Sequence, residues 1–232
     1  MGKHARAAPY MVTVGRRVGS AGFTFPSGRV HIYIPTASIG TGPLIDTASG
    51  DNLANVGGAP TELTIGSDLF YLLTSSKRYV DAAVASRITD EFTALGIIST
   101  DDDTVQRVAR YTLGTFGFNF ILQGFSDIMQ MQTGLQLGQR SISPAVGTPV
   151  DMVLVVGNSG WKMFINGVVA SSGSGVDDYT GAKGAGVYFG RNNESSTNST
   201  NIYYGPFHVW SRALSDVEVE TARRAAGRPA AA

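Results

Sequence analysis

The dipeptide Asn166-Gly167 constrains the fold of this chain more than any other feature. It lies between two runs of β-forming residues, 161–165 and 168–170. A two-residue type I′ turn requires positive φ at both central positions, a conformation that Asn and Gly adopt more readily than other residues. The dipeptide therefore predicts a tight hairpin in which Ile165 pairs with Val168.

The same hairpin predicts which side chains share a face. We expect Phe164 opposite Val169, and successive side chains of a strand point to opposite faces. Trp161 and Met163 should then lie on one face, whereas Lys162 and Phe164 lie on the other.

Further β-forming segments occur along the whole chain. Turn residues separate them every ~8–12 positions, a spacing typical of an antiparallel sandwich. Besides the hairpin, the predicted strands are 22–26, 29–35, 63–65, 69–73, 79–80, 91–98, 105–113, 116–122, 128–132, 135–137, 150–156, 186–190 and 202–210.

One helix is predicted near the C-terminus. Ser215 and Glu218 have the spacing of a capping box, in which each side chain accepts from the other's backbone N–H. Leu214 and Val219 occupy the two positions of a hydrophobic staple. Gly227 can end the helix in the left-handed conformation.

Composition limits the partners of this chain. It has 232 residues, with 18 basic and 18 acidic residues and no cysteine. This length suits one all-β sandwich, and the balanced charge argues against nucleic acid or an anionic membrane as a partner. The lack of cysteine excludes disulfides and thiolate metal sites. We expect neither a secretory signal nor a membrane span, because no segment has the required apolar run.

The parts of the C-terminal half follow a specific order. An apolar strand and Trp161 precede MFINGVV, and then VYFG (187–190) and YYGPFHVWSRALSDVEVE (203–220) follow. This order resembles the laminin-G-like, or concanavalin A-like, jelly-roll family, and a weaker similarity covers segments between residues 46 and 98. The resemblance implies an all-β fold: a two-sheet antiparallel jelly-roll sandwich with one short C-terminal helix. The expected organisation is an N-terminal arm (1–28), the jelly roll (29–226) and a C-terminal tail (227–232).

The histidines and carboxylates are the candidate catalytic groups. A nucleophile–base–acid triad needs a histidine at a loop end beside a serine and an aspartate. His4 lies in the arm, whereas His31 and His208 lie within strand patterns and are expected to be partly exposed. Glycan-cleaving relatives of the fold carry Glu-x-Asp-x-x-Glu on one strand, and this pattern is absent. Asp90-Glu91 would point to opposite faces. We therefore expect no enzymatic activity.

Two acidic clusters are candidate metal ligands. They contain Asp101 and Asp103 in one segment, and Asp177 and Asp178 in another. Carboxylate oxygens suit calcium, and laminin-G-like domains often hold calcium at one rim. The alternative is that both clusters are solvated loops, and no other cofactor is expected.

The resemblance also implies a glycan ligand. Jelly rolls bind sugars through aromatic and amide side chains on a concave sheet or on the rim loops. Phe164 and Lys162 are the candidates on the sheet, and Asn192, Asn193 and Tyr203 are the candidates in and after the polar loop. The alternative is that the aromatic side chains are covered by packing.

The basic N-terminal segment suggests where such a domain works. Arg6, Tyr10, Arg16 and Arg17 are the candidate assembly contacts. A lectin-like domain with a basic arm is similar to accessory structural proteins of tailed bacteriophages. This implies a non-enzymatic virion protein of the capsid or tail, present in multiple copies or as a homo-oligomer, that contacts other virion proteins and host glycans. A free carbohydrate-binding module and a glycan-cleaving enzyme remain as alternatives.

Overall fold

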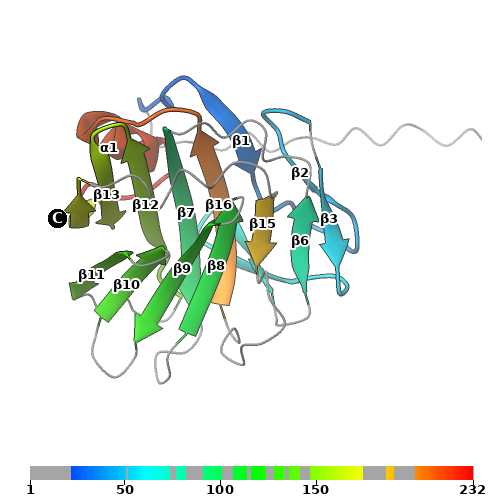
Figure 1. Ribbon diagram of the computed structural model, residues 1–232. Coiled ribbons are helices and arrows are strands. Elements are labelled where there is room, and N and C mark those ends of the chain that lie inside the picture. The colour runs from blue at the N-terminus through cyan, green and yellow to red at the C-terminus, as the bar shows by residue number, and fades with distance from the viewer. Residues whose placement is uncertain are drawn as a thin grey trace, which may run out of the picture.

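The computed structural model describes most of the chain as two packed β-sheets and one helix (Figure 1). This confirms the predicted all-β, two-sheet antiparallel sandwich with a short C-terminal helix. The described residues are 22–50, 52–73, 77–81, 91–100, 107–113, 116–123, 128–133, 136–141, 147–174, 187–190 and 202–231.

Within the described residues, each sheet has eight strands. Sheet 1 follows the order β14 (Val168–Gly173), β13 (Gly160–Ile165), β12 (Val150–Gly157), β7 (Phe92–Thr100), β16 (Ile202–Trp210), β5 (Asp68–Leu72) and β4 (Thr61–Ile65), with β1 (Arg29–Tyr33) also on β16. Sheet 2 follows the order β11 (Gln136–Ser141), β10 (Ile128–Thr133), β9 (Phe116–Gln123), β8 (Arg107–Leu113), β15 (Val187–Gly190), β6 (Arg78–Asp81), β3 (Asn52–Val56) and β2 (Leu44–Ile45).

The predicted hairpin joins β13 to β14. Asn166 has φ of 48° and Gly167 has φ of 78°, as a type I′ turn requires. Ile165 pairs with Val168, and Phe164 with Val169, as the sequence predicts. A bulge between Met163 and Phe164 then shifts the register, so that Lys162 lies opposite Ser172.

Strand β16 has two different neighbours along one edge. Tyr203 and Tyr204 pair with β5, whereas residues 207–210 pair with β1. The change occurs at Gly205-Pro206, where the pairing with β7 also shifts register. Proline has no N–H to donate to a ladder, so this break in the pairing falls where a ladder bond is unavailable.

Two apolar cores form on opposite faces of sheet 1. The first contains Trp161 and Met163 together with Leu53 and Tyr79 of sheet 2. The second contains Phe164, and helix α1 (Asp216–Ala225) covers it. The predicted division of the β13 side chains between two faces is therefore confirmed. No helix in the described part of the chain is long and apolar enough to span a membrane.

Helix α1 begins and ends as the sequence predicts. Ser215 and Glu218 form the capping box, and Leu214 and Val219 are both buried in the second core. At the other end Gly227 has φ of 78°, and its N–H and that of the next residue bond back to the last turn, at 3.0 and 2.9 Å. This pattern of two bonds is a Schellman motif.

A buried charge cluster joins α1 to β12. Asp151 and Arg223 are both fully buried, and the guanidinium donates to the two carboxylate oxygens at 2.5 and 2.9 Å. Burial by itself would lower the pKa of Arg223, but the hydrogen bonds and charge of Asp151 raise it. Arg228 adds a third group, with its Nε 3.3 Å from the same carboxylate. Breaking such a pair costs about 3–5 kcal/mol, because it leaves a buried charge uncompensated.

Residues on both sides of segment 29–226 also pack against the sandwich. Residues 22–26 are not a strand, contrary to prediction, but Phe25 packs against the rings of His208 and Trp210. The Trp210 indole donates to the Pro26 carbonyl at 3.1 Å. In the predicted tail, Arg228 is only 9% exposed.

A second buried polar pair fixes the loop after β2. The carboxylate of Asp46 accepts from His31 Nδ1 at 2.7 Å, from Ser49 Oγ at 2.6 Å and from three backbone N–H groups. Burial would raise the pKa of Asp46, but these hydrogen bonds outweigh it and hold the pKa at about 2. Because an ionised carboxylate can only accept, His31 carries its proton on Nδ1 in this pair.

Replacing Gly167 by Ala should disrupt the Asp151–Arg223 cluster as well as the turn. A Cβ at residue 167 would overlap the Arg223 guanidinium. Because both the backbone conformation and the buried charge pair are affected, we expect the free energy of unfolding to fall by roughly 3–5 kcal/mol. Urea denaturation measures this loss.

The control for this prediction is Gly66→Ala in the turn between β4 and β5. Gly66 also has positive φ, 61°, but its Cβ would meet nothing within 4 Å. Only backbone strain remains there, so we expect a loss of about 1–2 kcal/mol. Equal losses in the two variants would contradict a coupling between the hairpin and Arg223.

Acidification should remove the contribution of Asp46 to stability. Its pKa is about 2 in the folded protein and 3.8 ordinarily, so its contribution is complete above about pH 4 and is lost as the pH falls toward 2. Asp46→Asn should destabilise the protein at neutral pH by roughly 1–3 kcal/mol. It should also make the loss of stability below pH 4 shallower, as urea midpoints across this range would reveal. An unchanged slope would contradict the assignment.

Candidate functional site

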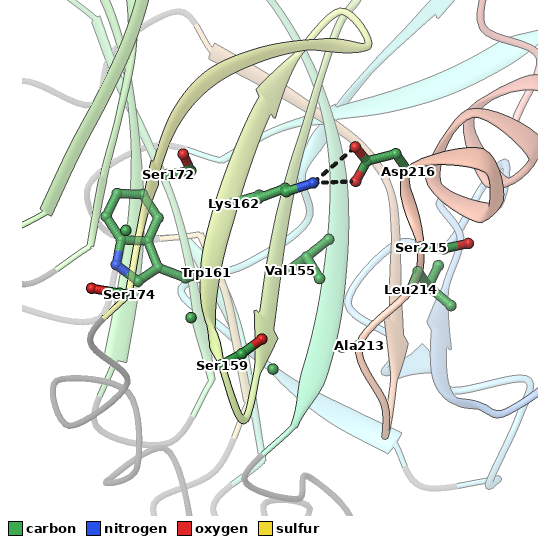
Figure 2. A pocket seen from close by; sticks show the side chains of 13 residues that line it. Val155, Ser159, Trp161, Lys162, Ser172, Ser174, Ala213, Leu214, Ser215 and Asp216 are labelled. Carbon is green, nitrogen blue, oxygen red and sulfur yellow. Dashed lines mark hydrogen bonds and ion pairs between the residues drawn. The ribbon is translucent and has the colours of Figure 1, made fainter.

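An open groove lies at one end of sheet 1, beside the start of α1 (Figure 2). Its volume is ≈ 700 Å³, within the range of about 300–1,000 Å³ that is usual for small-ligand sites. Its lining comes from the β12–β13 hairpin, the end of β14 and the segment that enters α1: residues 155, 157, 159–162, 172–174 and 213–216.

Three neighbouring strands supply the floor of the groove. Val155 of β12 pairs with Lys162 of β13, and Lys162 pairs with Ser172 of β14. Directly paired residues of adjacent strands point to the same face, so these three side chains form one row across the sheet. The bulge in β13–β14 is what places Ser172 in this row.

Buried hydrogen bonds hold the opposite wall in place. Thr93 of β7 is fully buried, and its hydroxyl donates to the Arg212 carbonyl at 3.0 Å while accepting from the Leu214 N–H at 2.9 Å. Arg212 also binds both oxygens of Glu218, at 3.0 and 2.5 Å. These bonds fix the chain that leads into α1 and so position Asp216.

An ion pair crosses the groove from floor to wall. Lys162 Nζ lies 2.7 and 2.8 Å from the two carboxylate oxygens of Asp216 (Figure 2). The side chains are 45% and 58% exposed, so both remain accessible to a ligand. Asp216 stands in the first turn of α1, where the helix dipole stabilises a negative charge.

Glycine residues determine how closely the walls approach one another. A Cβ at Gly157 would lie 3.2 Å from that of Ala213, and one at Gly173 would lie 2.6 Å from the Trp161 indole nitrogen. Gly173 therefore packs directly on the indole. Trp161 is only 5% exposed, and Figure 2 shows it on the other side of β13 from Lys162, so its ring offers no open stacking surface.

The structure separates the predicted glycan-binding residues. Lys162 lines the groove. Phe164 is 3% exposed and packs in the second core, and Tyr203 is 9% exposed in the same core. The predicted open sheet face at Phe164 is instead covered by α1, because this outer face of sheet 1 is apolar and needs a partner. Asn192 and Asn193 lie outside the described residues.

The predicted metal and assembly residues fall outside the part of the chain that the structure describes. These are Asp101, Asp103, Asp177 and Asp178 for the metal, and Arg6, Tyr10, Arg16 and Arg17 for assembly. Within the described ranges, no group of three or more His, Asp or Glu side chains could hold a metal ion.

Two histidines were expected to be partly exposed in strands, and this expectation is wrong. His31 and His208 are fully buried. His31 pairs with Asp46, and His208 lies 4.7 Å, ring to ring, from Phe25. Neither histidine reaches the groove, because His31 lies on β1 and His208 on the outer face that residues 22–26 cover.

Apart from Lys162, the polar residues of the groove were not predicted as ligand-binding residues from the sequence. Asp216 lies in the first turn of the predicted helix, and that position gives no sign of the contact with Lys162. Ser172 gave no usable signal, since its neighbour Ser171 is identical and only the bulge selects between them.

Comparisons with solved structures support the fold. The receptor-binding domain of botulinum neurotoxin D has a TM-score of 0.61 at 14% identity, and the match covers 86% of this chain and 52% of that one. Domain 4 of AbnA, an extracellular GH43 arabinanase from Geobacillus stearothermophilus in complex with arabinotriose, has a TM-score of 0.57 at 13% identity, with coverages of 85% and 98%.

A sialidase from Trypanosoma rangeli has a TM-score of 0.57 at 12% identity, and the match covers 87% of this chain and 33% of that one. The chain thus spans about half of the toxin domains and a third of the sialidases that it matches. No protein-family model matches the chain, and no curated protein is significantly similar to it. At these identities the likeness shows a shared β-sandwich fold alone.

Proposed function

We propose that this domain binds carbohydrate in the groove without cleaving it. The observation that carries the proposal is the half-exposed pair of Lys162 and Asp216, set in a groove of ≈ 700 Å³. Sugars are recognised through hydroxyl groups that both donate and accept hydrogen bonds, and this pair offers N–H donors beside carboxylate acceptors.

The rest of the lining suits the same kind of ligand. Ser159, Ser172 and Ser174 are exposed and add hydroxyl groups. Glycine and alanine form much of the remaining surface, which leaves space for a sugar ring. A few polar side chains in fixed positions can orient such a ligand in a cleft that is otherwise lined by small residues.

The structural neighbours add support by analogy of fold alone. AbnA domain 4 was solved with arabinotriose, and it matches this chain over nearly its own full length. The toxin neighbours are receptor-binding domains.

A non-catalytic role agrees with the carboxylates of the groove. Most glycoside hydrolases place two carboxyl groups on either side of the scissile bond. Among the described residues that line the groove, Asp216 is the single carboxylate, and it is paired with Lys162. We therefore prefer binding to hydrolysis.

Filling the groove should abolish binding. We expect Ser172→Tyr to weaken glycan affinity at least about tenfold, a loss of about 1.4 kcal/mol, because the new ring would occupy the ligand's place. A glycan array identifies the ligand, and titration calorimetry of wild type and variant measures the change.

The matched control is Thr64→Tyr, which places the same ring on an exposed position of β4, the opposite edge of sheet 1. It should leave affinity unchanged, and both variants should keep the wild-type melting temperature. Glycan binding that survives Ser172→Tyr would place the site elsewhere, and turnover of a bound glycan would support the enzymatic alternative.

We also propose that the domain acts as a multi-copy accessory protein of a virion, attached by its basic N-terminal arm. A lectin-like sandwich that is preceded by basic residues, Arg6, Arg16 and Arg17 among them, supports this role. A free carbohydrate-binding module is the alternative, and mass spectrometry of purified particles distinguishes the two.

Deletion of residues 1–20 should separate folding from attachment. Residues just after this segment already pack on the sandwich, with Phe23 under Arg224 and Phe25 against His208. We therefore expect an unchanged melting curve by circular dichroism and a loss of the protein from sedimented particles. Full retention on particles would move the attachment surface to the sandwich itself.

A further inference from the structure

We infer that the groove selects uncharged glycans over glycans that carry a carboxylate, an inference that rests on the proposed carbohydrate binding. The pair of Lys162 and Asp216 carries it. Lys162 is the one cationic side chain among the described residues that line the groove, and its Nζ lies 2.7 and 2.8 Å from the oxygens of Asp216. The cation is therefore neutralised before any ligand arrives.

The charges next to this pair are balanced as well. Arg212 is bonded to both oxygens of Glu218, which also accepts from the Ser215 N–H. The pKa of Glu218 is lowered to about 2, chiefly by the hydrogen bond from Arg212, so this carboxylate stays ionised. Two ion pairs thus stand side by side at the entrance to α1, and neither leaves a net positive charge for an acidic sugar.

The N-terminus of α1 does not change this balance. A helix N-terminus attracts anions through its free N–H groups and its dipole. Here the Ser215 hydroxyl caps the Glu218 N–H, and Asp216 and Glu218 already supply negative charge in the first turn. An incoming carboxylate would meet these two groups.

The hydrogen-bond donor and acceptor positions that remain free on Lys162 and Asp216 favour hydroxyl groups as ligands. An ammonium has three N–H donors, and Asp216 takes two, which leaves one. The carboxylate has acceptor positions beyond those that Lys162 fills. Neighbouring sugar hydroxyls can use both, since each hydroxyl donates and accepts. A carboxylate only accepts, so it can use the third N–H alone and is repelled by Asp216.

The selectivity should be moderate and sensitive to salt. Lys162 and Asp216 are about half exposed, and water and ions screen charges at such positions. We therefore expect roughly a tenfold preference for neutral ligands, largest at low ionic strength.

The test uses the full chain and paired oligosaccharides. Neutral arabino-, xylo-, gluco- and galacto-oligosaccharides are compared with counterparts of equal length that contain a uronic or sialic acid. Calorimetry at low and at physiological salt gives the ratio of the two dissociation constants. Wild-type protein should bind the neutral member about tenfold more tightly.

Asp216→Asn should remove this preference. The variant frees the Lys162 ammonium, so affinity for the acidic member should rise about tenfold and become strongly salt-dependent. Glu62→Gln makes the same change in net charge at an exposed position of β4 and should leave the ratio unchanged. If Asp216→Asn does not fold, Lys162→Met provides the second test: it should weaken neutral binding and give no gain for acidic ligands.

The outcomes separate the selectivity from the proposed function. The wild-type protein could bind acidic and neutral members equally tightly, with Ser172→Tyr abolishing both. That result would overturn the selectivity, but carbohydrate binding in the groove would still hold. An unchanged ratio in Asp216→Asn would also overturn the selectivity. Binding of no member of either series would overturn the proposed function, and the selectivity with it.

Discussion

The buried carboxylate of Asp151 is the interaction on which most of the structure depends. It receives the guanidiniums of Arg223 and Arg228, which fasten α1 and the chain after it to β12. The backbone of the same residue bonds to Asn166, whose amide oxygen accepts from the Asp151 N–H at 3.1 Å. One residue thus connects the hairpin turn, the central apolar strand and the C-terminal helix.

The contacts of Asp151 with Arg223 and Arg228 also determine where the groove lies. Helix α1 covers the second core on the outer face of sheet 1, in which Phe164 is buried, and leaves the row at Lys162 open beside the helix start. The first helical turn then brings Asp216 over the sheet to meet Lys162. The candidate site is therefore a consequence of how the helix is anchored at its far end.

Local signals in the sequence predicted the elements well. The Asn166-Gly167 turn and the capping box of Ser215 depend on residues close together in the chain, so the sequence pattern contains all the information that specifies them. Buried polar pairs between distant segments left no such signal. Asp151 lies inside an apolar run, and its ion pair was not predicted. His31 was expected to be partly exposed. The reason is the same for both residues, because the partner of each lies far away in the chain.

The sequence by itself determined the all-β class, the central hairpin with its pairing and the helix with its caps, because backbone preferences and strand periodicity act over a few residues. The tertiary structure alone decided which face of sheet 1 the helix covers and which serine the bulge turns toward Lys162. It also brought Lys162 and Asp216 together across 54 positions of sequence. Contacts of that range depend on how the sheet and helix pack, and packing is a property of the whole folded chain.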